Sequence, residues 1–122
     1  MSRKTQDKAV LDEFAKVDCK VVVWLLVKDG KIAGKITARE GGRDTSHVAF
    51  VLFTDGLKPA VYGYRRMTGA GYPRISSGIA DILRANRKEL QEHGVFIRDH
   101  WDLMNTWEKD LQDSGFLVLS TI

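Results

Sequence analysis

The fold of this chain is decided by residues 21–39, VVVWLLVKDGKIAGKITAR. The continuous apolar run predicts a strand over Cys19–Lys28 that lies inside a sheet and is covered on both faces. Asp29-Gly30 is typical of a two-residue hairpin turn, and Lys31–Arg39 predicts the returning strand. Its alternation places Ile32, Gly34, Ile36 and Ala38 toward the core and Lys31, Ala33, Lys35, Thr37 and Arg39 outward.

The remaining elements are predicted outward from this hairpin. Thr5 caps an amphipathic helix over Gln6–Val17. Further strands are expected over His47–Thr54, Ala60–Met67 and Phe116–Thr121, and helices from Pro73 to Gly94 and from Asp99 to Asp113. The order α-β-β-β-β-α-α-β predicts one α+β domain over residues 1–122, with an antiparallel four- to five-stranded sheet and helices packed on one face.

Length and composition indicate which broad class of protein this chain belongs to. A chain of 122 residues with 43% hydrophobic and 29% charged residues is typical of one soluble globular domain. The lone Cys19 cannot form an internal disulfide and predicts a buried thiol in a reducing compartment. The longest apolar run, Val21–Val27, is too short to span a bilayer, and the N-terminus lacks the apolar core of a signal peptide. We therefore expect a cytoplasmic protein without a membrane partner.

The net charge of +3 is unevenly distributed along the chain. Residues 1–19 are neutral, residues 20–74 carry +6, and residues 75–122 carry −3. The basic segment could attract a phosphate backbone or an acidic protein face, although solvated strands rich in lysine show the same imbalance. Both interpretations stay open at this point.

Residues 62–74, YGYRRMTGAGYPR, form the candidate binding segment. Tyrosine rings can stack on a planar group, arginine guanidiniums bind anions, and backbone amides of glycines before a helix can receive a phosphate or carboxylate. The candidate partner-binding residues are Tyr62, Tyr64, Arg65, Arg66, Gly69, Gly71, Tyr72 and Arg74, joined by Lys31, Lys35 and Arg39. A tight connection in which Gly69 or Gly71 has a positive φ is the alternative explanation of the glycines.

Other motifs argue against catalysis and cofactor binding. Gly69-Ala70-Gly71 lacks the third glycine of a dinucleotide site and the Gly-Lys-Ser/Thr of a phosphate-binding loop. The three histidines lack cysteine partners, so we expect no metal. Ser46 and His47 are neighbours on a strand and should face opposite sides, with His47 exposed or at an edge. Trp24, Trp101 and Trp107 are all expected in the core, with Trp101 and Trp107 in the apolar stripe of the helix from Asp99. Trp101 lies near the helix start, where a partly exposed indole is the alternative and could contact a partner.

Two resemblances suggest partners. From Gln6 to Asn86, the order helix, three strands, glycine-containing turn, helix resembles a double-stranded-RNA-binding domain, with Thr68–Arg74 at that family's glycine and lysine turn. That family carries a cluster of lysines at the helix start, and in this chain only Arg74 occupies a corresponding position. The strand Ala60–Met67 is an addition to the family's order of elements. This resemblance implies nucleic-acid binding.

The Gly-Ala-Gly-Tyr turn before Ser76–Ala80 and the closing Gly115–Leu119 are similar to small accessory proteins of phages and mobile elements. That group includes inhibitors of host defence such as anti-CRISPR proteins, which implies a non-enzymatic protein that acts by binding a protein or nucleic acid. The alternative is a small enzyme with an anionic substrate at the Gly69–Arg74 turn. A flat basic surface would favour the binding protein, and a deep pocket with buried titratable groups would favour the enzyme.

Overall fold

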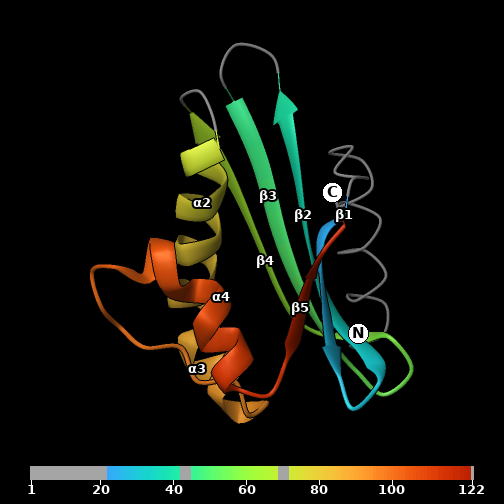
Figure 1. The fold of residues 1–122 in the computed structure, drawn as a ribbon. Coiled ribbons are helices and arrows are strands. Elements are labelled where there is room, and N and C mark those ends of the chain that lie inside the picture. Colours follow the sequence, from blue (N-terminus) through green and yellow to red (C-terminus); the bar gives the residue numbers. More distant parts are fainter. Residues whose placement is uncertain (1–21, 42–44, 69–71, 122) are drawn as a thin grey trace, which may run out of the picture.

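The computed structural model describes residues 22–41, 45–68 and 72–121, except the side chains of residues 40, 41 and 72–74 (Figure 1). Its elements are β1 (Val22–Lys28), β2 (Lys31–Gly41), β3 (Thr45–Thr54), β4 (Lys58–Thr68), α2 (Tyr72–Ala85), α3 (Arg87–Glu92), α4 (Leu103–Asp113) and β5 (Leu117–Ser120). The predicted α+β class is confirmed. The predicted helix Gln6–Val17 lies outside the described residues, as do Cys19–Val21.

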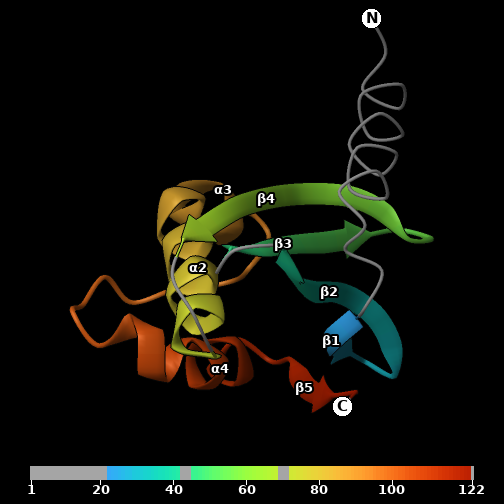
Figure 2. The same ribbon diagram turned by 90° about the horizontal axis from the view of Figure 1, so that it is seen from above.

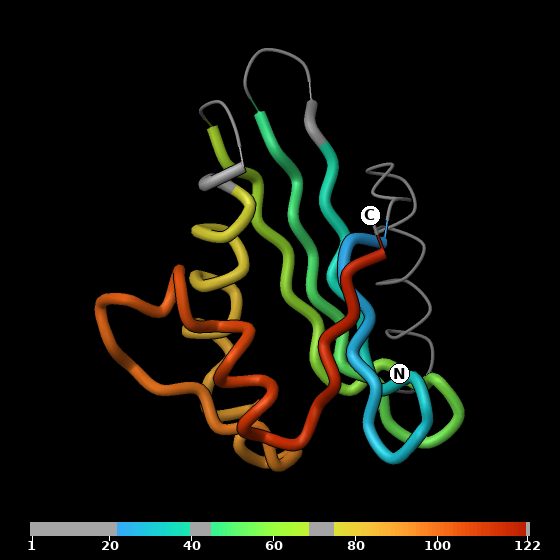
Figure 3. The backbone as a smooth tube through the Cα atoms, viewed as in Figure 1, coloured from blue at the N-terminus to red at the C-terminus, as the bar shows by residue number. Residues whose placement is uncertain are grey.

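The sheet has the strand order β4-β3-β2-β1-β5, and every neighbouring pair is antiparallel. Asp29-Gly30 forms the predicted hairpin turn, and both residues have a positive φ, 53° at Asp29 and 74° at Gly30. Glycine adopts such an angle without steric cost. β5 returns from the end of the chain and pairs with β1 (Figure 3), so β1 is an interior strand, as predicted.

Two bulges change which side chains face the core. The register shifts between Val22 and Trp24, so Val23 and Trp24 both lie in the core cluster. A second shift lies between Leu26 and Val27 of β1, which pair with Gly34 and Ile32 of β2, so Ala33 has no partner residue in this register. Ala33 consequently packs against the core and Ile32 is 47% exposed, so the predicted alternation is wrong at these two positions.

The predicted helix from Pro73 to Gly94 is two helices. It breaks at Asn86, where the backbone has φ −106° and ψ 17°. The Asn86 side-chain amide donates a hydrogen bond to the Ile82 carbonyl at 2.8 Å, and this local bond competes with regular helix geometry. α2 and α3 therefore follow each other with a bend between them, and the described order after β4 is α-α-α-β.

The predicted helix from Asp99 begins later, at Leu103. At the start of the stretch 98–102, the buried Asp110 carboxylate accepts hydrogen bonds from the Arg98 backbone amide at 3.0 Å and from its guanidinium at 2.8 Å. Trp101 lies in this irregular stretch and is 92% exposed. The prediction that Trp101 belongs to the apolar stripe of the helix is wrong.

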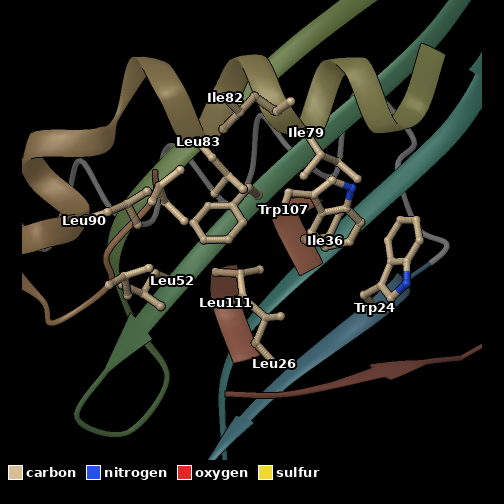
Figure 4. Packing of buried hydrophobic residues seen from close by; sticks show 14 of the residues in the cluster. Trp24, Leu26, Ile36, Leu52, Ile79, Ile82, Leu83, Leu90, Trp107 and Leu111 are labelled. Carbon is tan, nitrogen blue, oxygen red and sulfur yellow. The ribbon is translucent and has the colours of Figure 1, made fainter. Parts of the chain in front are cut away.

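The main core lies between the sheet and the helices (Figure 4). Trp24 of β1 and Trp107 of α4 are both buried and meet edge to face, with ring centroids 5.0 Å apart. Gly63 of β4 allows α2 to approach closely, because a Cβ atom there would lie 2.1 Å from the Ile82 Cγ2 methyl. The described helices all lie on one side of the curved sheet (Figure 2), as predicted.

Candidate binding face

The face of the sheet turned away from α2, α3 and α4 is called here the outer face. Strand register and burial assign its side chains, because alternate residues of a strand share a face and cross-strand partners point the same way. Its members are Leu25, Val27, Ile32, Lys35, Thr37, Arg39, His47, Ala49, Val51, Phe53, Tyr62, Tyr64, Arg66, Leu117 and Leu119.

Positive charge gathers on the sheet and negative charge on the helical side. Every charged side chain that the structure describes on a strand is basic: Lys28, Lys31, Lys35, Arg39, Lys58, Arg65 and Arg66. Described carboxylates occur in the turns at Asp29 and Asp55 and otherwise between Asp81 and Asp113. The charge asymmetry predicted along the sequence is therefore also an asymmetry between two layers.

Three cations or potential cations form a line across the outer face. Arg39 is paired with His47 in the register of β2 and β3, and His47 is paired with Arg66 in the register of β3 and β4. We call Arg39, His47 and Arg66 the cationic row. Neighbouring strands are about 4.8 Å apart, so the row extends over about 10 Å.

His47 links the cationic row to the tyrosines. Its Nδ1 atom is hydrogen-bonded to the Tyr64 hydroxyl, and the two rings are stacked with centroids 5.9 Å apart. Burial lowers the pKa of His47 below its ordinary value, and the positive charges of Arg39 and Arg66 lower it further. His47 is half-buried on an interior strand, so the prediction of an exposed or edge position is wrong.

Tyr62 and Tyr64 lie beside the cationic row on β4. Both are half-buried and pack against a small cluster formed by Ala49 and Val51. Register pairs Tyr64 with Ala49 and Tyr62 with Val51. Small side chains on β3 thus leave room for two aromatic rings on the sheet surface.

Arg65 and Arg66, which the sequence suggested as one unit, lie on opposite faces. Arg65 is paired in register with Val48, a core residue, and its Nε is 3.6 Å from a carboxylate oxygen of Asp81 on α2. Arg66 shares the outer face with His47. Of the two arginines, the structure therefore brings only Arg66 to the cationic row.

The other candidate binding residues also lie at different places. Lys35 occupies the middle of the outer face, opposite Leu25 and Val51 in the register. Lys31 is paired with Lys28 beside the hairpin turn, away from the cationic row. Gly69 and Gly71 lie outside the described residues, as do the side chains of Tyr72 and Arg74, so the predicted positive φ and the predicted anion site at this turn stay predictions.

The β5 side of the outer face is apolar. Leu117 and Leu119 are 56% and 41% exposed and are paired in register with Val27 and Leu25 of β1. Ile32 joins them because of the bulge in β2. Sequence alternation could have indicated Leu117 and Leu119, but it could not indicate Ile32.

Concave sites are also present on the described surface. One depression lies along Arg84–Glu89 and Asp99, and another lies between the two hairpin turns, where Lys28, Lys31 and Phe53 contribute. Neither lining pairs a nucleophile with a base. Among the described residues, no three His, Cys, Asp or Glu side chains form a group that could hold a metal ion. The described helices also include none long and apolar enough to cross a membrane.

A functional assignment by similarity needs a shared family, a related sequence or a shared fold. The chain matches no family model, no curated protein and no solved structure, so the chemistry of its own surface carries the functional argument.

Proposed function

We propose that this chain is a non-enzymatic binding protein that contacts an anionic macromolecule through its outer face. The observation that carries the proposal is the separation of charge between the two layers, with the exposed Arg66 on the outer face of the sheet. A field of one sign attracts a partner of the opposite sign and fixes its orientation. A nucleic acid or an acidic protein face meets this condition.

An accessory role in a phage or mobile element, including inhibition of a host defence system, is the setting that the sequence pattern suggests, and it stays a prediction. Proteins of that kind act by occupying a surface of their target, which is compatible with contact through one face of the sheet. The enzyme alternative receives no support from the two described depressions, because neither brings together the groups that acid–base or nucleophilic catalysis requires.

The two neighbouring arginines of β4 provide a matched test. Arg66→Gln and Arg65→Gln remove the same charge from adjacent positions, but only Arg66 lies on the outer face. Retention on immobilised heparin, a polyanion, is measured as the salt concentration that elutes each full-length chain. We expect Arg66→Gln to elute at clearly lower salt than the parent chain and Arg65→Gln to elute close to it. Equal shifts for the two variants would contradict the proposal.

Thermal unfolding of both variants is the control for folding. Arg66 is an exposed cation, and Arg65 forms an ion pair that is more than half exposed on the arginine side. Exposed charges and surface ion pairs contribute about 0–1 kcal/mol to stability. Both variants should therefore melt within a few degrees of the parent chain, so that a change in retention reports binding.

A further inference from the structure

The centre of the outer face is closed to solvent. Thr37, Ala49 and Val51 form this centre on β2 and β3, and their exposed fractions are 1%, 0% and 0%. An antiparallel sheet that is covered on one side only normally leaves the side chains of its other face in water. The described helices cannot provide the missing cover, because they all lie on the opposite side of the sheet (Figure 2).

The described strands explain only part of this burial. Aromatic rings of β3 and β4 pack against Ala49 and Val51. Thr37, however, lies on β2, which β3 separates from the tyrosines of β4, and its hydroxyl oxygen is buried. The Arg39 Nε atom, far out on a long side chain, is buried as well. Side chains stand roughly perpendicular to a sheet, so a buried guanidinium nitrogen requires a cover above the strands and not only neighbours beside it.

We infer that this cover is the helix predicted over Gln6–Val17, which packs on the outer face with Phe14 toward the centre. The helix belongs to the segment of 21 residues that precedes β1 in this chain. The connections 42–44 and 69–71 have three residues each, too few to form a layer over two strands. The inference goes beyond the proposed function and does not rest on it.

The segment has the reach that this position requires. A helix over the 12 residues 6–17 is about 18 Å long. Residues 18–21 join it to Val22 and can span about 13 Å when extended. β1 and β3 are two strand spacings apart, about 10 Å. Val22 pairs with Thr37 in the register, so the segment enters the sheet beside a residue that it would cover.

The apolar side of the predicted helix fits the centre of the face. Val10, Phe14 and Val17 recur at spacings of four and three residues, which places them on one side of a helix. The side chains at the centre are short, so they leave room for a large ring above them. Burial of this apolar side against the sheet would exclude water from both surfaces.

Charge supports the same orientation. Asp7 and Asp18 lie at the two ends of this apolar side, at helical spacing from its members. Lys35 and Arg39 border the centre along β2, and opposite charges attract more strongly at partly buried positions than in water. The segment would thus neutralise part of the basic face and leave the exposed Arg66 for an anionic partner.

A nitroxide label tests this placement in the full chain. It is attached to the thiol of Ala9→Cys, on the predicted polar side of the helix, in a chain that also carries Cys19→Ser. Paramagnetic broadening of backbone amide NMR signals falls steeply with distance. We expect clear broadening at Thr37 and Ala49 and much less at Leu111 on α4, beyond the sheet. Equal broadening at all three residues, or none at Thr37 and Ala49, overturns the inference.

The rate of thiol labelling tests whether Phe14 holds the cover in place. In the Cys19→Ser chain, Thr37→Cys supplies a reporter thiol at the centre, and its reaction with iodoacetamide is followed by mass spectrometry. We expect Phe14→Asp to accelerate this reaction about 10- to 150-fold, the factor that corresponds to loss of one buried phenylalanine side chain. Ala9→Asp introduces the same charge on the polar side and should leave the rate close to that of the parent chain. Equal rates in the two variants contradict the inference.

A second reporter distinguishes local opening from unfolding of the whole domain. Val48→Cys places the thiol in the main core, on the opposite face of β3. This thiol should stay protected in Phe14→Asp. If Phe14→Asp accelerates both reporters equally, the whole domain opens, and the nitroxide measurement alone decides the placement.

Other occupants of the face give different results. Broadening at Thr37 in isotope-labelled chains that carry no nitroxide, after mixing with spin-labelled chains, would assign the cover to a second copy and overturn the inference. If the Thr37→Cys thiol reacts as fast as in the urea-unfolded chain, the face is open in the isolated protein and the inference fails. None of these measurements uses a polyanion, so they can fail while the Arg66-dependent retention on heparin stands, and the reverse also holds.

Discussion

At the scale of single residues, His47 connects folding to the proposed binding chemistry. Burial and the two flanking arginines favour its neutral form, while its hydrogen bond to the Tyr64 hydroxyl joins β3 to β4. The sequence places His47 on a strand, but its partners come from β2 and β4, 8 and 19 positions away in the chain. Those neighbours depend on strand register, which the local pattern does not specify.

The lowered pKa of His47 predicts a pH-dependent stability. Below about pH 6.5, the ordinary histidine value, the unfolded chain binds the His47 proton before the folded chain does, so the free energy of unfolding should fall as pH is lowered toward the folded pKa. At pH 7.5 and above this contribution is constant. Urea unfolding at pH 7.5 and pH 5.5 should show a smaller pH effect for His47→Gln than for the parent chain.

The comparison isolates His47 because His93 and His100 are present in both chains. Equal losses of stability on acidification, in the parent chain and in His47→Gln, would show that the environment of His47 does not disfavour its charged form. A steeper loss in His47→Gln would reverse the proposed sign.

At the scale of elements, the sequence predicted the strands and most of the helical residues, because alternation and helical spacing are local signals. The interior position of β1 followed from its apolar run, and the first hairpin followed from Asp29-Gly30. Local signals could not locate the bulge that exchanges Ile32 and Ala33, because a bulge is defined by pairing with another strand. Arg65 and Arg66 are a different case, because alternation along the predicted strand Ala60–Met67 is a local signal that already places neighbouring residues on opposite faces.

The contact between Gly63 and α2 predicts a cost for any added side chain. In Gly63→Ala, the new methyl group would overlap the Ile82 Cγ2 methyl, so the variant should lose about 1–3 kcal/mol of stability through overpacking. Ile82→Leu lacks that methyl group and should cost less than about 1.5 kcal/mol alone. The double variant should therefore be more stable than the sum of the two single effects predicts, as measured by urea unfolding. Strict additivity would show that α2 moves away instead.

At the scale of the whole molecule, one apolar core joins layers that come from distant parts of the sequence. Trp24 belongs to the first described strand and Trp107 to the last helix, and their contact connects the basic sheet to the acidic helical side. β5 then returns the end of the chain to β1. The segment charges predicted an asymmetry, but only the packing of helices on one face turns it into a basic surface opposite an acidic one.

This shared core predicts that the two layers unfold together. Leu26 of β1 and Leu111 of α4 are both fully buried in it, and replacement of either by Ala should cost about 2–5 kcal/mol through lost burial and a residual cavity. Tryptophan fluorescence reports mainly on the buried Trp24 and Trp107 at the contact between the layers, whereas far-UV circular dichroism reports on all strands and helices. In each variant the two unfolding curves should coincide at a lower urea midpoint, because loss of the shared core removes the support of both layers at once. A fluorescence transition that precedes the circular dichroism transition in Leu111→Ala would show instead that α4 detaches while the sheet remains folded.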